Sequence, residues 1–170
     1  MATPDRGLEA DRSLTYIPDL APCDYFSFFE IERVRAVGWL DAFHRFPKGS
    51  VPRGTLRRLA ALRKWARSDS MGVHLCELCP VTVHDATGII GRWHACRARS
   101  GANVFVPGQG VVYAAPVLIL HYIRSHDYLP PPEFLAATKA CPLARVPYYR
   151  AIIENGPDTF RLYFGDQVAT

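Results

Sequence analysis

The sequence predicts a single small domain of the α+β class, and three features of the pattern support this. Residues 103–113 read as the two strands of a β-hairpin around a Pro-Gly loop. Several other segments place apolar residues at helical spacing. A Cys-x-x-Cys pair precedes the hairpin and two histidines follow it, which suits a treble-clef-like or ββα-like zinc knuckle, hairpin and helix. We expect this domain over residues 14–170, after a loose N-terminus over residues 1–13.

The first segments are predicted as a short strand and a helix. Residues 14–17 form the strand, which Pro18 ends. Residues 25–37 form an aromatic-rich helix, and Gly38 is its C-cap. Trp39 follows as a buried anchor, so this part of the chain is expected to contribute to the core.

A loop and a basic helix are predicted next. Prolines and glycines mark residues 41–54 as a loop, and Thr55 can N-cap a helix that runs to about residue 67. One face of this helix is an apolar stripe of Leu56, Leu59, Leu62 and Ala66. Most of the other positions are basic, which suggests a nucleic-acid interface or a solvated face. The candidate phosphate-binding residues are Arg57, Arg58, Arg63, Lys64 and Arg67.

The second half of the chain alternates between strands and helices. Residues 81–83 and 89–90 are weak strand signals, and the hairpin pairs 103–106 with 111–113 across a four-residue loop. Pro116 can begin a helix that ends near residues 126–127, because three consecutive prolines follow at 130–132. The remaining predicted elements are helices over 133–140 and 148–154 and a final strand over 160–164.

The most specific chemical signal is Cys76-x-x-Cys79. Two thiolates at this spacing can present both sulfurs to one ion. His121 and His126 stand on the predicted helix after the hairpin, within the spacing of helix-borne zinc ligands. Five residues turn an ideal helix by about 140°, so the last helical turn must loosen for both imidazoles to reach one ion. We predict a Zn²⁺ site made of these four residues.

Other ligand sets are compatible with the same pair of cysteines. His74 is two residues before Cys76, so in an extended chain both side chains face the same way, and His74 is a substitute ligand. His94 and Cys96 form a second, more local alternative. Four protein ligands would make a closed structural site, whereas three would leave a position for water. Glu77 is then the candidate general base.

Composition and charge exclude several protein classes. With 170 residues, 49% hydrophobic and 21% charged, the chain is long and apolar enough for one globular core. The first fifteen residues lack the apolar stretch of a secretory signal, and the longest apolar run is too short to span a bilayer. We therefore expect a cytoplasmic protein without a membrane partner, whose five cysteines are thiols or metal ligands.

The sequence resembles a family of small bacterial proteins of unknown function. The resemblance spans most of residues 14–138 and rests on short pieces with HxCELC, VYAAPxLIxHYI and HxYLPP patterns. In this chain they are residues 16–20, 38–41, 74–79, 106–108, 112–123 and 126–131. The resemblance implies a bacterial cytosolic protein in which the knuckle, the hairpin and the histidine-bearing helix form one unit. It does not indicate which activity the protein has.

Three functions fit these observations. The first is a non-enzymatic, zinc-stabilised interaction module, whose unknown partner docks on the basic helix or on Tyr148 and Tyr149, expected to be exposed. The second is a metal-dependent hydrolase that uses Glu77, His74 or His126 beside an open metal position. The third is a nucleic-acid-binding protein that uses the basic helix over residues 53–67.

Overall fold

A three-stranded mixed sheet is the centre of the fold. The computed structural model describes residues 16–26, 31–67, 74–79, 81–83, 92–94 and 99–169. The strand order is β1-β7-β6, with β1 (Val34–Ala36) parallel to the central strand β7 (Val112–Pro116). The hairpin partner β6 (Asn103–Pro107) runs antiparallel to β7, and Phe105 faces Ala114 across the pair. Every residue of β6 and β7 is buried, so the centre of the sheet is covered on both faces.

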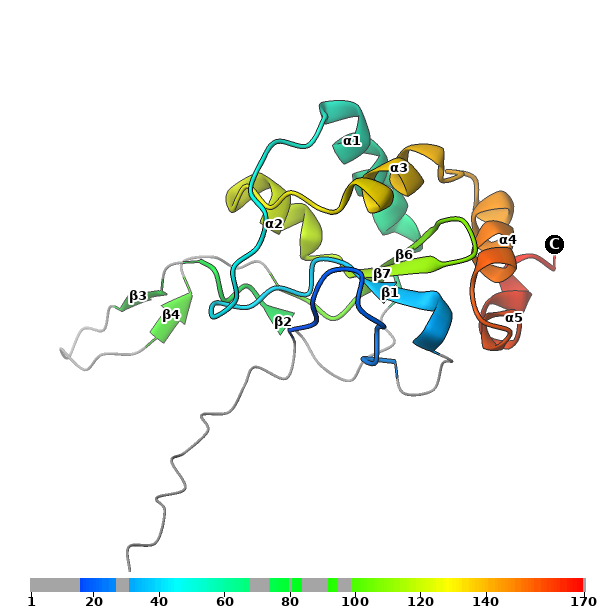
Figure 1. The fold of residues 1–170 in the computed structure, drawn as a ribbon, viewed down its shortest axis with the longest axis horizontal. Coiled ribbons are helices and arrows are strands. Elements are labelled where there is room, and N and C mark those ends of the chain that lie inside the picture. Colours follow the sequence, from blue (N-terminus) through cyan, green and yellow to red (C-terminus); the bar gives the residue numbers. More distant parts are fainter. Residues whose placement is uncertain are drawn as a thin grey trace, which may run out of the picture.

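Helices cover this sheet and build the core. α1 (Arg53–Leu62), α2 (Ile119–Ser125) and α3 (Pro132–Ala140) lie above the sheet in Figure 1. α4 (Arg145–Asn155) and α5 (Thr159–Phe164) lie beyond one end of it. Short 3₁₀ turns occupy Ile31–Arg33, Arg63–Trp65 and Gly165–Gln167. The fold therefore combines helices with a small mixed sheet, and the predicted α+β class is confirmed.

Two small two-stranded ladders lie outside the central sheet. β2 (His74–Leu75) pairs antiparallel with β5 (Arg99–Ser100), and β3 (Val81–Val83) pairs antiparallel with β4 (Arg92–His94). The first ladder carries the chain into the Cys-x-x-Cys turn. Residues 1–13 and the predicted strand at 89–90 lie outside the described residues. No helix in the described ranges is long and apolar enough to cross a membrane.

Several predicted elements agree with the structure. The hairpin forms with a four-residue connection at 108–111, one residue later than expected, and the predicted helices over 133–140 and 148–154 are α3 and α4. Helix α4 ends at Asn155, directly before Gly156. Trp39 is buried, and its indole N–H donates to the carbonyl of Ala114 at 3.0 Å.

The helix predicted over 25–37 is wrong in its C-terminal part. Val34–Ala36 is instead strand β1, whose residues are registered against 112–114 of β7. Val34 and Ala36 are buried, and Arg35 between them is partly exposed, which is the alternation of a strand. Three residues are too few for this alternation to be recognised in the sequence without its partner strand. Gly38 is therefore not a helix C-cap; it has a φ of +72° in the connection after β1.

Two further predictions are corrected. Thr55 is not the N-cap of α1: Pro52 precedes the helix, and Thr55 is buried in its first turn. The final strand over 160–164 is helix α5. Phe160 and Phe164 are both fully buried against Phe105, while Leu162 between them is 88% exposed. Positions four apart share a face in a helix as well as in a strand, so the sequence pattern alone did not separate the two.

Gly38 gives a test of this packing. A Cβ at Gly38 would lie 3.0 Å from Cγ1 of Ile119 in α2, at a φ that side chains rarely adopt. We expect Gly38→Ala to lower the free energy of unfolding by about 2 kcal/mol, because it combines backbone strain with overpacking. Gly54→Ala is the matched control, since a Cβ there meets nothing within 4 Å on helix α1. It should raise stability by about 0.5–1 kcal/mol. Urea denaturation of both variants measures this, and equal effects would contradict the proposed packing.

Candidate metal centre

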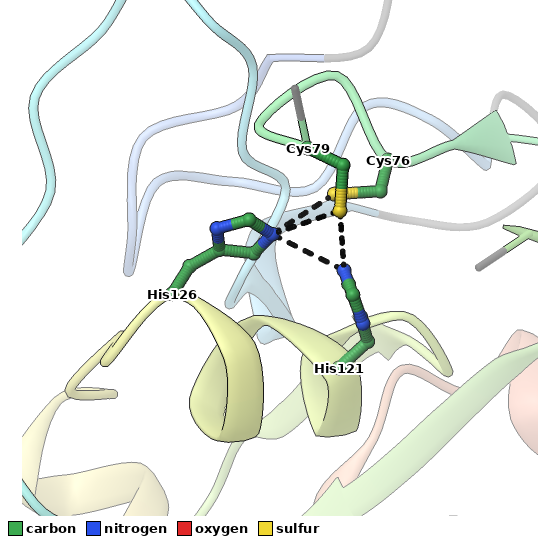
Figure 2. A group of neighbouring side chains, drawn as sticks. All are labelled: Cys76, Cys79, His121 and His126. Carbon is green, nitrogen blue, oxygen red and sulfur yellow. Dashed lines mark hydrogen bonds between the residues drawn. The ribbon is translucent and has the colours of Figure 1, made fainter. Parts of the chain in front are cut away.

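The two cysteines lie on a tight turn that follows strand β2. Pairing of His74 and Leu75 with β5 fixes the start of the turn, and the chain then bends over residues 77–79. This bend points both thiols to the same side, as Figure 2 shows. Cys76 is 1% exposed and Cys79 8% exposed, so both sulfurs are withdrawn from solvent.

The two histidines come from helix α2 and the residue just beyond it. His121 lies within α2, whereas His126 is the first residue after the helix, with φ −128° and ψ 9°. Asp127 then takes a left-handed conformation with φ +56°. The helix therefore unwinds at His126, which brings its imidazole back toward that of His121, as the five-residue spacing requires.

The four side chains converge on one point. His126 Nε2 lies 3.3 Å from the Cys76 sulfur and 3.4 Å from the Cys79 sulfur. His121 Nε2 lies 3.3 Å from the Cys79 sulfur and 3.1 Å from His126 Nε2. One ligand atom from each of the four residues lies within 4.8 Å of all the others. Two segments more than 40 residues apart in sequence thus form a cluster that can hold a metal ion.

The electrostatic environment favours neutral imidazoles. Burial lowers the pKa of His121, and the neighbouring His126 lowers it further. Burial also lowers the pKa of His126, Lys48 acts in the same direction, and Asp127 opposes both. A neutral imidazole has a free lone pair, which is the form that binds a metal ion. The cluster therefore offers two imidazole nitrogens and two cysteine sulfurs as possible donors to a metal ion.

His74, the predicted substitute ligand, is directed elsewhere. Its Nε2 is hydrogen bonded to the hydroxyl of Tyr25 at 3.0 Å, and its ring packs edge-on against Trp39. Burial lowers the pKa of His74, which keeps the ring uncharged in this aromatic setting. Glu77, the candidate base, is exposed. The side chain of His94, on β4, and the whole of Cys96 lie outside the described part of the chain.

The basic residues of the predicted nucleic-acid interface do not form one free surface. Arg58 donates to the carbonyls of Thr138 and Cys141, which ties α1 to the end of α3. The guanidinium of Arg67 lies 4.8 Å from the centre of the Tyr163 ring. Arg57, Arg63 and Lys64 are exposed, and the Lys64 ammonium lies 4.6 Å from the centre of the Trp65 ring. Arg58 and Arg67 therefore have clear intramolecular roles.

The expectation that Tyr148 and Tyr149 are exposed docking residues is wrong. Tyr148 is fully buried and Tyr149 is 4% exposed. The Tyr148 hydroxyl donates to the carbonyl of Phe105 at 2.7 Å, and burial raises its pKa. Tyrosine has a polar hydroxyl, so its position at the surface or in the core cannot be told from the sequence. In the fold, Tyr148 packs on the sheet, and Tyr149 packs on Trp65 and on α5. They belong to the core.

The loop over 41–54, which carries no predicted functional residue, borders the cluster. His44, Arg45, Lys48 and His126 line a hollow of about 400 Å³ between this loop and the cysteine turn. Asp41, which is 1% exposed, holds His44: a carboxylate oxygen lies 2.9 Å from the imidazole Nδ1. The close spacing of His44, Arg45 and Lys48 in the sequence could have indicated a cationic site. Only the fold places these three residues beside His126.

Comparison with known proteins identifies the family of the chain. The sequence model described as a domain of unknown function (DUF7919) matches residues 15–139, which include all four residues of the Cys/His cluster. The chain belongs to this family. Neither a curated protein nor a solved structure gave a significant match.

Removal of single ligands tests which histidines hold the metal. We expect purified protein to carry about one metal ion per chain, as a four-ligand site would. His126→Ala and His121→Ala should each lose most of it, because each removes a nitrogen from the cluster. His74→Gln should keep it, because the His74 ring contacts Tyr25 and Trp39. Elemental analysis beside circular dichroism measures this. Metal loss in His74→Gln with retention in His126→Ala would instead make His74 a ligand.

Proposed function

We propose that this DUF7919 chain is a cytoplasmic zinc-binding protein whose metal is structural and which acts as an interaction module. The observation that carries the proposal is the convergence of two sulfurs and two nitrogens. A tetrahedral zinc ion, with bonds of about 2.3 Å to sulfur and 2.0–2.1 Å to nitrogen, implies ligand–ligand separations of about 3.3–3.8 Å. Four of the six separations between donor atoms are 3.1–3.4 Å, which is close to those values, and all six are within 4.8 Å.

The donor set supports zinc over harder cations. Calcium and magnesium prefer oxygen ligands, whereas thiolate and imidazole together are typical of zinc. The four cysteines in the described part of the chain are thiols that form no disulfide, which agrees with a reducing compartment such as the cytoplasm. The site also joins the cysteine turn to helix α2, so an ion there would cross-link two segments of the fold.

The geometry supports a structural metal over a hydrolytic one. Four protein donors complete a tetrahedral shell, and a water nucleophile would need a fifth position or the loss of a ligand. Glu77 would be the base of a hydrolase, but it is exposed, whereas the two cysteine ligands are buried. In this proposal the ion stabilises the turn at 76–79 and presents its outer residues to a partner.

An interaction role is supported by large apolar side chains that remain on the surface. Phe43 is 80% exposed and Leu162 88% exposed. Leu75, which is 44% exposed, lies directly before Cys76. A partner protein that docked on Leu75 would contact a segment held by the metal. This would make binding of the partner depend on zinc.

Zinc content and stability of a double variant test the proposal. Cys76→Ser/Cys79→Ser should lose its zinc and unfold at lower temperature, because metal binding contributes directly to folding free energy. Cys23→Ala/Cys141→Ala is the matched control, since burial raises the pKa of both thiols to about 12 and keeps them protonated. The control should retain the zinc of the parent protein. A well-folded parent without zinc would refute the proposal.

Cobalt substitution distinguishes a closed site from an open one. A closed Cys₂His₂ shell should give the intense visible absorption of tetrahedral cobalt(II), unchanged by small anions that compete for an open position. A spectrum that shifts on addition of azide would show an exchangeable position and support the metal-dependent hydrolase. Glu77→Gln should then abolish turnover without loss of metal.

A nucleic-acid-binding role is the second candidate, favoured by the exposed cations of α1 and the 3₁₀ turn after it. Arg57, Arg63 and Lys64 are exposed, and none forms an ion pair with a carboxylate among the described residues. If these three contact phosphates, the logarithm of the affinity for duplex DNA should fall with the logarithm of salt concentration at a slope of about −3. Absence of binding at low salt would reject this candidate.

A further inference from the structure

An apolar groove adjoins the loop that borders the metal cluster. Its volume is about 650 Å³, which is in the range of small-molecule sites. Residues from three segments, 16–20, 45–47 and 129–135, line it together with Leu40. The walls are mainly aliphatic and aromatic, and include Leu20, Leu40, Phe46, Leu129 and Leu135. A molecule in this groove would therefore place an apolar body against it.

One end of the groove is cationic. Arg45 and Phe46 line both the groove and the 400 Å³ hollow beside His126, so the two concavities adjoin at this pair of residues. The hollow adds His44 and Lys48. Among the described residues, neither Arg45 nor Lys48 forms an ion pair with a carboxylate. Their charges are available to an anionic group that lies across the junction.

The position of His44 is fixed by its neighbours. Its Nδ1 faces the buried carboxylate of Asp41 at 2.9 Å, and its ring stacks on Tyr16 with 3.7 Å between ring centres. Tyr16 is itself a wall of the groove. The buried Asp41 thus fixes His44, and through it Tyr16, where the apolar groove meets the cationic hollow. These side chains therefore need to move little when a ligand binds.

Two acidic side chains, Asp19 and Glu133, also line the groove, but neither lines the hollow that holds His44 and Lys48. Asp19 lines the groove, but its carboxylate accepts hydrogen bonds from the Tyr128 hydroxyl at 2.8 Å and the Gly38 N–H at 2.9 Å. Glu133 is exposed and also borders a different hollow, beside residues 107–109. Asp127 is adjacent to His126, and it does not line the groove or the hollow.

We propose that the groove and the hollow form one binding site for an amphipathic carboxylate. Its hydrocarbon body lies along Leu20, Phe46 and Leu135, and its carboxylate lies at Arg45 and Lys48. This site is separate from the metal ligands, apart from the edge that His126 contributes to the hollow. It adds a small-molecule ligand to the proposed interaction module and does not depend on the nature of the metal.

Calorimetric titration of the full-length protein with decanoate, below its critical micelle concentration, tests the site. We expect one decanoate per chain, with decanol and acetate each at least tenfold weaker because they lack the carboxylate and the hydrocarbon body, respectively. Arg45→Ala should weaken decanoate at least tenfold, and Arg45→Lys should recover part of the loss. Arg124→Ala is the matched control, because Arg124 is exposed on α2 and lines neither concavity.

A second variant tests the apolar half of the site. Leu135→Trp should fill the groove and reduce decanoate binding at least tenfold while circular dichroism and metal content stay unchanged. Equal affinity for decanoate and decanol, together with no effect of Arg45→Ala, would overturn the proposal and indicate apolar adsorption only. Equal affinity for acetate would indicate a simple anion site. No binding of decanoate would exclude the site, whatever the metal content of the protein.

Discussion

Strand β7 pairs with a neighbour on each side, and these two pairings position the helices and turns around it. β7 joins β6 through a local hairpin and β1 through a parallel pairing with a segment about 80 residues earlier in the chain. Helix α2 begins three residues after β7 ends, so its position is set by that strand. The close contact of Gly38 with Ile119 in α2 fixes the helix against the connection after β1. Placement of His121 and His126 follows from this arrangement.

The Cys/His cluster brings the cysteine turn at 76–79 into contact with helix α2, more than 40 residues later in the chain. The cysteine turn has little secondary structure of its own, since β2 pairs with only two residues of β5. Its two sulfurs nevertheless lie within about a ligand–ligand distance of the histidines after β7. Both sulfurs are buried and both imidazoles are partly buried, so an ion there would hold the turn against α2. A short turn of this kind gains most from such a cross-link, because it buries little apolar surface itself.

The loop over 41–54 connects the two candidate sites. Its first residue, Asp41, is almost fully buried and orders the following turn by accepting from the backbone N–H groups of Phe43 and His44. The same loop gives one face to the hollow at His126 and another to the apolar groove. Backbone bonds from Gly49 and Leu129 tie the loop to the chain beyond α2. A loop held in this way is a suitable place for ligand contacts, because its side chains are positioned by a fixed backbone.

Features whose signals lie within a few residues could be predicted without the structure. The hairpin, helices α3 and α4, the α+β class and the four residues of the Cys/His cluster were all predicted from spacing and composition. Elements that depend on a partner far away in the sequence could be assigned only from the folded chain. Val34–Ala36 is a strand because β7 lies beside it. Residues 160–164 are helical, and Phe160 and Phe164 on one face of this helix both pack against Phe105. Two predictions about functional residues also depended on the fold. Tyr148 and Tyr149 are buried rather than exposed, and His74 is hydrogen bonded to Tyr25. Contacts between residues far apart in sequence fix these choices, and a local pattern does not encode them.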